Sequence, residues 1–233
     1  MIPALLLLTL LPAIALQEAP PLEMMTYQMV LLLKGPSAEP NERDASKMQA
    51  EHLANLAALN RKRINLAYGP VLDGGDLRGI AILDVPSPQE AMRAFESDPF
   101  VKSGAMVAEV HPWMAPKNWF NPPATTQLEM PTAENLEPLV LGFLVRGPNP
   151  PQNRTGADEI QKGHLAYMEA LHKMGKLVAA GPFLDNTKAR GVVIYRVANV
   201  EEARSLAAAD PAVKAGRLVL EAHPWMTFKG ILK

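Results

Sequence analysis

Two stretches of the chain show the same succession of apolar and polar segments. In each stretch, an apolar run ends at Gly-Pro, a polar loop follows, and a long segment then repeats its apolar residues at helical spacing. Two further apolar runs, a shorter helical segment and a final alternating run complete the stretch. The succession predicts strand, helix, strand, strand, helix, strand. The expected first strands are 27–34 and 139–146, and the expected long helices are about 45–63 and 158–175.

The two stretches are copies of one unit, because their matching residues are always 112 positions apart. A repeat of this length exceeds the roughly 20–50 residues of solenoid repeats and indicates a duplicated domain. We expect domains at 24–115 and 138–233, joined by a proline-rich linker at 116–137. The clearest matches are Gly69-Pro70 with Gly181-Pro182, Asp98-Pro99 with Asp210-Pro211, and His111-Pro112-Trp113-Met114 with His223-Pro224-Trp225-Met226.

The order of the predicted elements indicates the fold class, α+β. A βαββαβ unit is the ferredoxin-like plan, whose two helices cover one face of the sheet. The other face of each final strand carries a Glu and a His, and two such faces in one chain would bury each other. We therefore expect two ferredoxin-like βαββαβ domains that form an intramolecular pseudo-dimeric α+β barrel around a partly polar cavity, in a monomeric chain.

The first residues predict a secretory signal peptide at 1–16. Residues 2–16 form an apolar run with small residues at 13 and 15, which is typical of a cleavage site. The run is shorter than the roughly 20 residues of a membrane span, and no Lys or Arg precedes it. We expect export to the periplasm or the extracellular space, with no stable membrane insertion after cleavage. A cytosolic protein with an apolar N-terminus is the alternative.

Composition excludes several classes of function. The formal net charge is −1, and the sequence has no basic cluster of the kind that binds nucleic acid. The absence of Cys excludes thiol nucleophiles and thiolate metal sites. The sequence has no Gly-rich phosphate loop and no nucleotide fingerprint. We therefore expect no cofactor, and a small-molecule ligand or substrate as the partner.

Two histidines of the long helices are the strongest candidates for chemistry. His52 and His164 fall within the apolar stripe of their helices, and a buried imidazole needs a hydrogen-bond partner. Asp73 and Asp185, each 21 residues further along the chain, are the expected partners. A carboxylate orients the imidazole and raises its basicity, as a general base requires. The alternative is a core histidine bound to a backbone carbonyl, with the aspartate capping a turn.

The Glu-x-His segments of the final strands form a second group of candidates. They could line the cavity as further acid/base groups, or His-Pro-Trp could simply end a strand and close the barrel with an aromatic ring. A metal site built from His52, Asp73 and His111 is conceivable, but no spacing resembles a metal motif, so we expect none. The four candidates of this group are Glu109, His111, Glu221 and His223.

The motifs, taken in order, resemble the YCII-related domain, and the resemblance covers nearly all of the chain after the N-terminal segment, twice. It implies a ferredoxin-like fold that pairs into an α+β barrel, as in muconolactone isomerase-like proteins. It also implies a cleft with a His–Asp pair associated with acid/base chemistry, here His52 with Asp73 and His164 with Asp185. The matching segments are His52-Leu53, Gly69 to Asp73, Asp98 to Gly104, His164-Leu165, Gly181 to Asp185, and Asp210 to Gly216.

The resemblance also suggests a class of reaction. At least one protein of the family is similar to a dehydrochlorinase that acts on a hydroxylated aromatic compound. We therefore expect cofactor-independent chemistry of the isomerase or lyase type on a small cyclic or aromatic compound, with His52 and His164 as general bases. A module that binds a small ligand without turnover is the first alternative. A scaffold whose paired sheets serve stability alone is the second.

Overall fold

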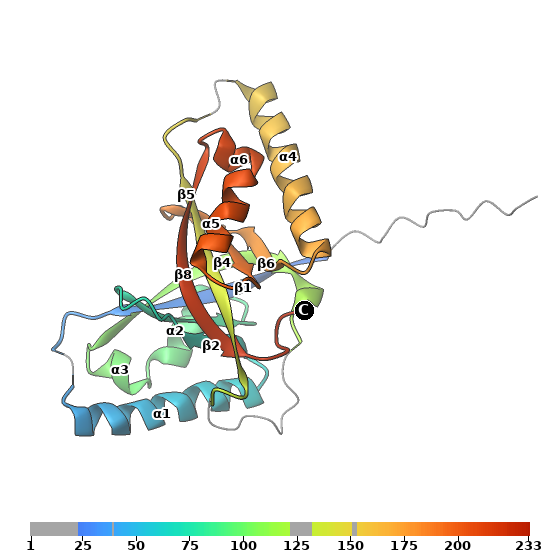
Figure 1. Ribbon diagram of the computed structural model, residues 1–233. Helices are drawn as coiled ribbons and strands as arrows, with labels where there is room; N and C mark the ends of the chain where they lie inside the picture. Colours follow the sequence, from blue (N-terminus) through green and yellow to red (C-terminus); the bar gives the residue numbers. More distant parts are fainter. Residues whose placement is uncertain (1–22, 39, 122–131, 151–152) are drawn as a thin grey trace, which may run out of the picture.

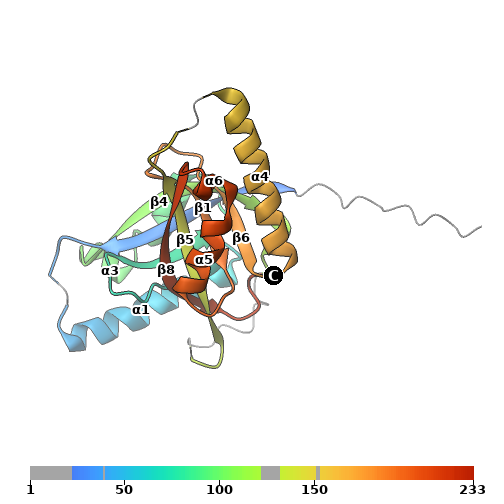
Figure 2. The ribbon, with the colours of Figure 1, turned by 45° about the horizontal axis from the view of Figure 1, so that its top comes forward.

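The computed structural model describes residues 23–38, 40–121, 132–150 and 153–233. The expected signal peptide and the middle of the expected linker lie outside these residues. Two four-stranded antiparallel sheets carry the fold, with strand orders β2-β3-β1-β4 and β6-β7-β5-β8. The expected pair of ferredoxin-like units is therefore confirmed. The long helices α1 and α4 lie on opposite sides of the molecule, outside the two sheets (Figures 1 and 2).

The two units have the same elements in the same order. The first comprises β1 (Met24–Lys34), α1 (Glu42–Arg61), β2 (Asn65–Pro70), β3 (Leu77–Leu83), α2 (Pro88–Phe95), α3 (Pro99–Lys102) and β4 (Met106–Pro116). A short 3-10 helix, η1 (Lys117–Trp119), follows. The second comprises β5 (Leu136–Arg146), α4 (Arg154–Lys173), β6 (Leu177–Pro182), β7 (Ala189–Tyr195), α5 (Val200–Ala209), α6 (Pro211–Lys214) and β8 (Leu218–Phe228).

Local sequence explains where the short helices begin. The Ser87 hydroxyl accepts a hydrogen bond from the Glu90 backbone N–H at 3.2 Å, and the Asn199 side chain caps α5 in the same way. Such caps satisfy backbone donors that the first turn leaves unpaired. Asp98 and Asp210 cap α3 and α6, with a proline at the first helical position of each. The caps therefore fix the positions of the two aspartates.

The two sheets close into a barrel along two seams, where the end of β2 meets β8 and the end of β6 meets β4. Val71 pairs with Trp225, and Phe183 pairs with Trp113, both antiparallel. The seams also contain main-chain hydrogen bonds, such as the bond from the Leu72 N–H to the Pro224 carbonyl at 2.9 Å. Each unit therefore supplies one strand to each seam, which is the expected intramolecular barrel.

The centre of the barrel is filled by apolar side chains. Met29 from β1 and Leu141 from β5 are both 0% exposed, and they face each other's sheet within one cluster. The expected partly polar cavity between the sheets is therefore wrong for the described residues. Burial of apolar side chains between two sheets is favourable, and the Glu and His residues of β4 and β8 lie toward one end instead.

The other end of the barrel is closed by the segments that follow β4 and β8. Phe120 pairs with Leu232, and both side chains are buried. Trp119 stacks on the His172 ring of α4 with a centroid distance of 4.0 Å. The chain after each unit thus covers the same end. The opposite end, called the mouth below, carries the Glu and His residues of β4 and β8.

Among the helices of the described residues, none is both long enough and apolar enough to cross a membrane.

Candidate active site at the barrel mouth

The repeated His-Pro-Trp segments form the two seams of the barrel. The Trp113 indole N–H donates to the Gly181 carbonyl at 3.0 Å, and the Trp225 indole N–H donates to the Gly69 carbonyl at 3.1 Å. Both glycines are required by close approach, because a Cβ at Gly181 would lie 1.7 Å from the Met114 carbonyl oxygen. The Gly-Pro and His-Pro-Trp motifs of opposite units are therefore partners.

The seams place a histidine of each unit opposite an aspartate of the other. His111 Nδ1 lies 2.7 Å from Asp185 Oδ2, and His223 Nδ1 lies 2.5 Å from Asp73 Oδ2. In each antiparallel seam, the residue two positions before the Trp lies opposite the residue two positions after its Phe or Val partner, on the same side of the seam. This register explains both contacts. Both His–Asp pairs of the mouth are therefore shared between the two units.

Because both contacts are at Nδ1, they determine which nitrogen of each imidazole can accept a proton. An ionised carboxylate accepts a hydrogen bond, so Nδ1 carries the proton and Nε2 of a neutral ring carries a lone pair. The His111 side chain is 14% exposed and the His223 side chain 26% exposed. Each ring is thus oriented by a carboxylate at Nδ1, and that contact leaves Nε2 uninvolved, which is the arrangement of a general base.

The carboxyl group of Asp73 is held in its charged form. Burial alone would raise its pKa, but hydrogen bonds from His223 and from the Gly75 backbone N–H lower the pKa of Asp73 below its ordinary value. The Gly75 N–H donates to Asp73 Oδ1 at 3.1 Å, while Oδ2 contacts the imidazole. Both oxygens of this carboxylate therefore have partners.

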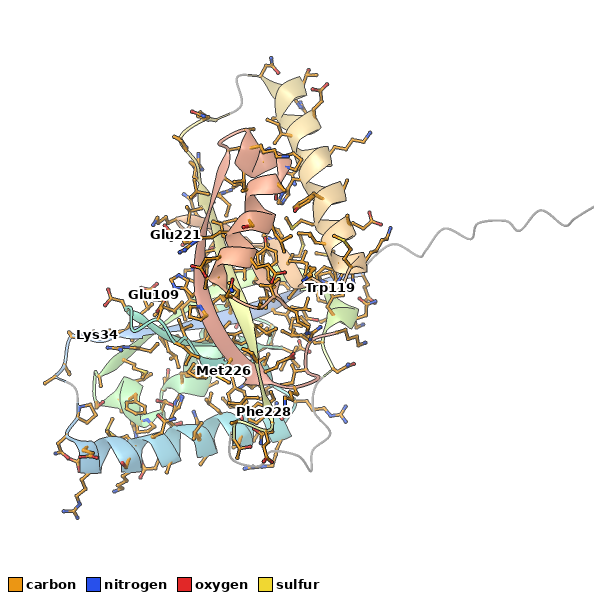
Figure 3. All side chains as sticks on the ribbon, in the orientation of Figure 1. Lys34, Glu109, Trp119, Glu221, Met226 and Phe228 are labelled. Carbon is orange, nitrogen blue, oxygen red and sulfur yellow. The ribbon has the colours of Figure 1, made fainter. Side chains whose placement is uncertain are left out.

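Two glutamates and two phenylalanines surround the pairs. Glu109 Oε2 lies 3.8 Å from His111 Nε2, whereas Glu221 forms an ion pair with Lys188 at 2.7 Å. Phe183 contacts the His111 ring at a centroid distance of 5.1 Å, and Phe143 contacts the His223 ring at 5.9 Å. Glu109 and Glu221 lie at the same end of the molecule, away from Trp119 and Phe228 (Figure 3).

A groove adjoins each pair on the surface of the molecule. The first, of about 410 Å³, runs between α2 and β4 and includes Glu109 and His111 in its lining. The second, of about 500 Å³, runs between α5 and β8 and includes Asp73. Volumes of this size match those of small-molecule sites, which span about 300–1,000 Å³.

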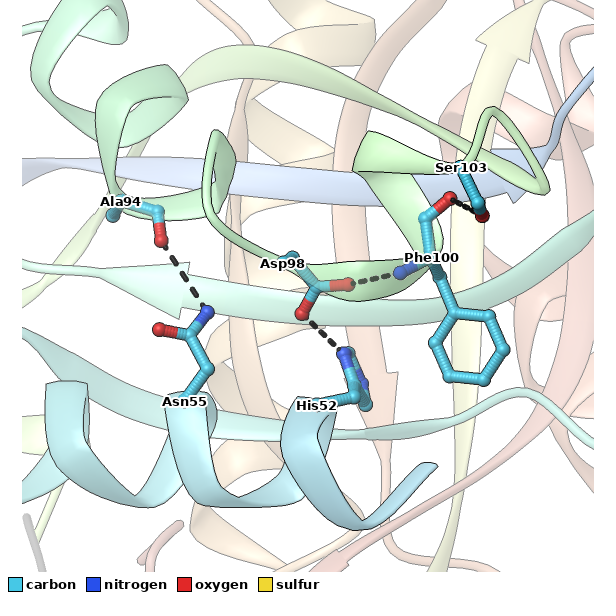
Figure 4. Close-up of polar contacts among 6 residues, drawn as sticks. All are labelled: His52, Asn55, Ala94, Asp98, Phe100 and Ser103. Atoms are coloured by element: carbon cyan, nitrogen blue, oxygen red, sulfur yellow. Dashed lines mark hydrogen bonds and ion pairs between the residues drawn. The ribbon is translucent and has the colours of Figure 1, made fainter. Parts of the chain in front are cut away.

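The expected partners of His52 and His164 are wrong. His52 Nδ1 contacts Asp98 Oδ2 at 2.5 Å, and His164 Nδ1 contacts Asp210 Oδ2 at 2.7 Å. Figure 4 shows His52 projecting from α1 toward Asp98, whose second oxygen accepts the Phe100 N–H. Asp98 is 0% exposed. These pairs join the long helices to the caps of α3 and α6, on the helix side of the sheets.

The physical reason for the error lies in how the units are joined. Asp73 and Asp185 follow β2 and β6, and both strands run past their own sheet to pair with the other unit. Sequence spacing within one copy contains no information on this exchange. The repeated Asp-Pro segments were a usable clue, because an aspartate that caps a short helix is fixed where a helical histidine can reach it.

The conceivable metal site of His52, Asp73 and His111 is also contradicted. Each of the three side chains belongs to a different pair, with Asp98, His223 and Asp185 respectively. Within the residues that the structure describes, no cluster of three or more His, Asp or Glu side chains could hold a metal ion. The four glutamate and histidine candidates of the final strands do lie at one end of the barrel.

Comparison with protein families assigns the chain. The model of the YCII-related domain matches it twice, at residues 26–114 and 143–225. The chain belongs to the YCII-related domain family. The two matches correspond to the two units of the fold, so each unit of this YCII-related protein contributes half of both seams. No curated protein sequence matches the chain significantly.

Solved structures align with this YCII-related protein, two of those described below over most of its length and with its fold. A chlorite dismutase-like protein aligns over 87% of this chain and 94% of its own, with a TM-score of 0.54 and 12% identity. A heme-binding protein from Thermus thermophilus aligns over 89% and 93%, with a TM-score of 0.52 and 12% identity. A 5-chloro-2-hydroxyhydroquinone dehydrochlorinase from Burkholderia phenoliruptrix covers only 36% of this chain, and 89% of its own, at a TM-score of 0.28 and 24% identity.

Proposed function

We propose that the barrel mouth binds a small cyclic or aromatic compound and moves a proton on it without a cofactor, in a reaction of the isomerase or lyase type. The observation that carries the proposal is the pair of shared contacts, His111 with Asp185 and His223 with Asp73. The general bases are then the histidines of the final strands, and His52 and His164 stabilise the fold. The adjoining grooves supply the room for a ligand.

The chemistry follows from the oriented rings. Nε2 of a neutral imidazole accepts a proton from an activated C–H or O–H group, and the aspartate stabilises the imidazolium that forms. A positioned base of this kind accelerates proton transfer by about 10²- to 10⁴-fold. Phe143 and Phe183, both buried, pack beside the two rings and hold them in place. The acid/base pair then needs no further group for tautomerisation or elimination.

The likeness to a heme-binding protein does not extend to a porphyrin site in this chain. A macrocycle between the sheets would have to displace Met29 and Leu141, which are 0% exposed. On the helix side of the second sheet, Tyr195 and Leu171 fill the corresponding space. At these positions buried side chains fill both faces of the second sheet, and we derive no step through haem.

The first experiment measures proton exchange directly. The protein is incubated in D₂O with a panel of lactones and hydroxylated aromatic compounds, and loss of C–H signals is followed by proton NMR. We expect at least one compound to exchange faster with the protein than without it. The double variant His111→Gln with His223→Gln should lower that rate by about 10²- to 10⁴-fold, because both bases are lost.

His172→Asn is the matched control. His172 lies on α4 and contacts the Leu177 carbonyl through Nδ1 at 3.0 Å, and its counterpart Asn60 makes the same kind of bond to Asn65. Exchange should persist in this variant. Binding of panel compounds without any exchange would favour the ligand-binding module instead. Exchange that survives the double variant but disappears in His164→Gln would contradict our assignment of the bases.

A further inference from the structure

We propose that the ligand of the mouth is a small aromatic carboxylate, and that it binds in the groove between α5 and β8 with Arg204 as its anchor. This inference rests on the proposed function and deepens it, because it names one of the two grooves and one class of compound. Two differences between the units carry it. Val140 occupies the position of Gln28, and Arg204 occupies the position of Met92.

The first difference leaves room beside β5. In the first unit, the Gln28 side-chain N–H donates to the Val85 carbonyl at 3.5 Å, and Gln28 is 1% exposed. Gln28 therefore bridges β1 to the segment after β3. The counterparts, Val140 and Val197, both line the second groove. Valine is shorter than glutamine and has no amide, so it cannot form this bridge. The second groove thus extends over a region that Gln28 fills in the first unit, and the lining of the first groove includes neither Gln28 nor Val85.

The second difference supplies a fixed positive charge. Arg204 of α5 lines the second groove, whereas the lining of the first groove contains no Lys or Arg. Arg204 Nη1 lies 3.5 Å from Glu201 Oε1, and the two side chains are 59% and 76% exposed. An exposed ion pair of this kind contributes little, so a ligand carboxylate can take the place of Glu201. The planar guanidinium binds a carboxylate through two parallel hydrogen bonds, which makes Arg204 a suitable anchor.

The rest of the lining suits the apolar part of such a compound. Most of its side chains are apolar, among them Pro138 and Leu72, which is 53% exposed. The remaining carboxylate of the lining, Asp73, contacts His223 and accepts the Gly75 N–H, so its charge is already offset. Apolar walls with a few placed polar groups are typical of small-molecule sites. The groove therefore favours a compact apolar body that carries one negative charge, and an aromatic carboxylate has this chemistry.

The anchor and the His–Asp pair come from opposite sides of one groove. Arg204 belongs to the second unit, whereas Asp73 follows β2 of the first unit, and both line the same space of about 500 Å³. A ligand whose carboxylate binds Arg204 therefore lies in the groove that Asp73 borders, and Asp73 is the partner of His223. The His223 pair is then the one that serves the ligand, with one ligand for each chain.

Calorimetric titration with a matched pair of compounds tests the anchor. The probes are para-hydroxybenzoate and para-hydroxybenzamide, which have nearly the same shape and differ in charge. We expect one benzoate to bind per chain, at least about 10-fold more tightly than the amide, because charge-assisted hydrogen bonds are the stronger ones. Arg204→Met should remove this preference. Arg93→Met removes the same charge from an exposed site of α2 outside both linings and should preserve it. Equal affinity for the two probes, or no binding of the benzoate at millimolar concentration, would overturn the proposal.

A reciprocal exchange of residues tests which groove is used. Val140→Gln introduces the residue of the first unit and should weaken binding of the benzoate about 10-fold or more, while Gln28→Val should leave it unchanged. Unchanged binding in Val140→Gln, or loss of binding in a folded Gln28→Val, would contradict the assignment. If Val140→Gln does not fold, the exposed Arg204→Met still decides the proposal. Proton exchange on uncharged compounds, without binding of the benzoate, would overturn this inference alone and leave the proposed function standing.

Discussion

The molecule contains two kinds of His–Asp pair with nearly the same geometry and different surroundings. His52 with Asp98 lies within one unit, under α1, and its aspartate is completely buried. His223 with Asp73 joins the two units and is partly open to solvent at the mouth. The contact distance is 2.5 Å in both. Distance alone therefore does not distinguish a structural pair from a candidate catalytic one.

The two kinds of pair differ in the contacts of the second carboxylate oxygen. In the within-unit pair, the second oxygen of Asp98 caps α3, so the carboxylate ties three segments together. In the cross-unit pair, Asp73 binds only its own turn and the histidine of the other unit. Loss of Asp98 should destabilise the fold, and loss of Asp73 should chiefly change the chemistry of the mouth.

Substitution of a seam glycine should cause the largest loss of stability among the variants that test this comparison. In Gly181→Ala the new Cβ would lie 1.7 Å from the Met114 carbonyl, a main-chain atom that cannot move alone. We expect a loss of stability above about 4 kcal/mol, or separation of the seam. Urea denaturation measures the loss. If the seam opens, the contact of His111 with Asp185 disappears and that of His52 with Asp98 persists.

Gly156→Ala is the control for the seam. Its Cβ would meet only the Asn153 side chain, at 3.2 Å, within α4. Alanine in a helix is favoured over glycine by roughly 1 kcal/mol, so this variant should be neutral or slightly stabilised. Equal stability of Gly181→Ala and Gly156→Ala would contradict the closed barrel.

Removal of the aspartates should cause the next largest loss of stability. Asp98→Ala leaves His52 buried without its partner and removes the cap of α3, which should cost about 3 kcal/mol. Asp73→Ala should cost less than about 1 kcal/mol, because the pair is partly exposed. Thermal and urea unfolding of the two variants compare the costs directly. A larger loss for Asp73→Ala would reverse our assignment of the two kinds of pair.

The pH dependence of the Asp73 contribution is the smallest predicted effect. The folded-state pKa of Asp73 is lowered, so its stabilising contribution is complete above its unfolded-state pKa, about 3.9. It is lost as the pH falls through the lower, folded-state pKa. The difference in unfolding free energy between the wild-type protein and Asp73→Asn should therefore be constant above about pH 5 and shrink toward pH 2. A difference that grows on acidification would show that the carboxylate is not stabilised in its charged form.

The sequence was sufficient for the fold because the duplication repeats every element at a fixed distance. The apolar periodicity of the long helices and the Gly-Pro ends of the strands predicted both ferredoxin-like units and their union in one barrel. The interior was predicted less well. In the sequence, the Glu and His residues on one face of β4 and β8 indicated that the whole inner face is partly polar. Met29 and Leu141 instead fill the centre, and Glu109 and Glu221 lie at the rim.

The candidate site could be predicted only as a set of residues. Asp73, Asp185, His111 and His223 were all among the candidates, but their partners depend on two seams between residues about 150 positions apart or 74 positions apart. Such contacts follow from how the sheets close, which local spacing does not encode. The helical histidines, by contrast, have partners in their own unit, 46 positions away.

The most direct test of the central claim asks which histidine responds to which aspartate. Long-range ¹H–¹⁵N NMR of the histidine rings is compared between the wild-type protein, Asp73→Asn and Asp185→Asn. The account predicts that Asp73→Asn shifts the His223 ring alone and that Asp185→Asn shifts the His111 ring alone, with His52 and His164 unchanged. A response of His52 to Asp73→Asn, or of His164 to Asp185→Asn, would contradict the shared site at the mouth.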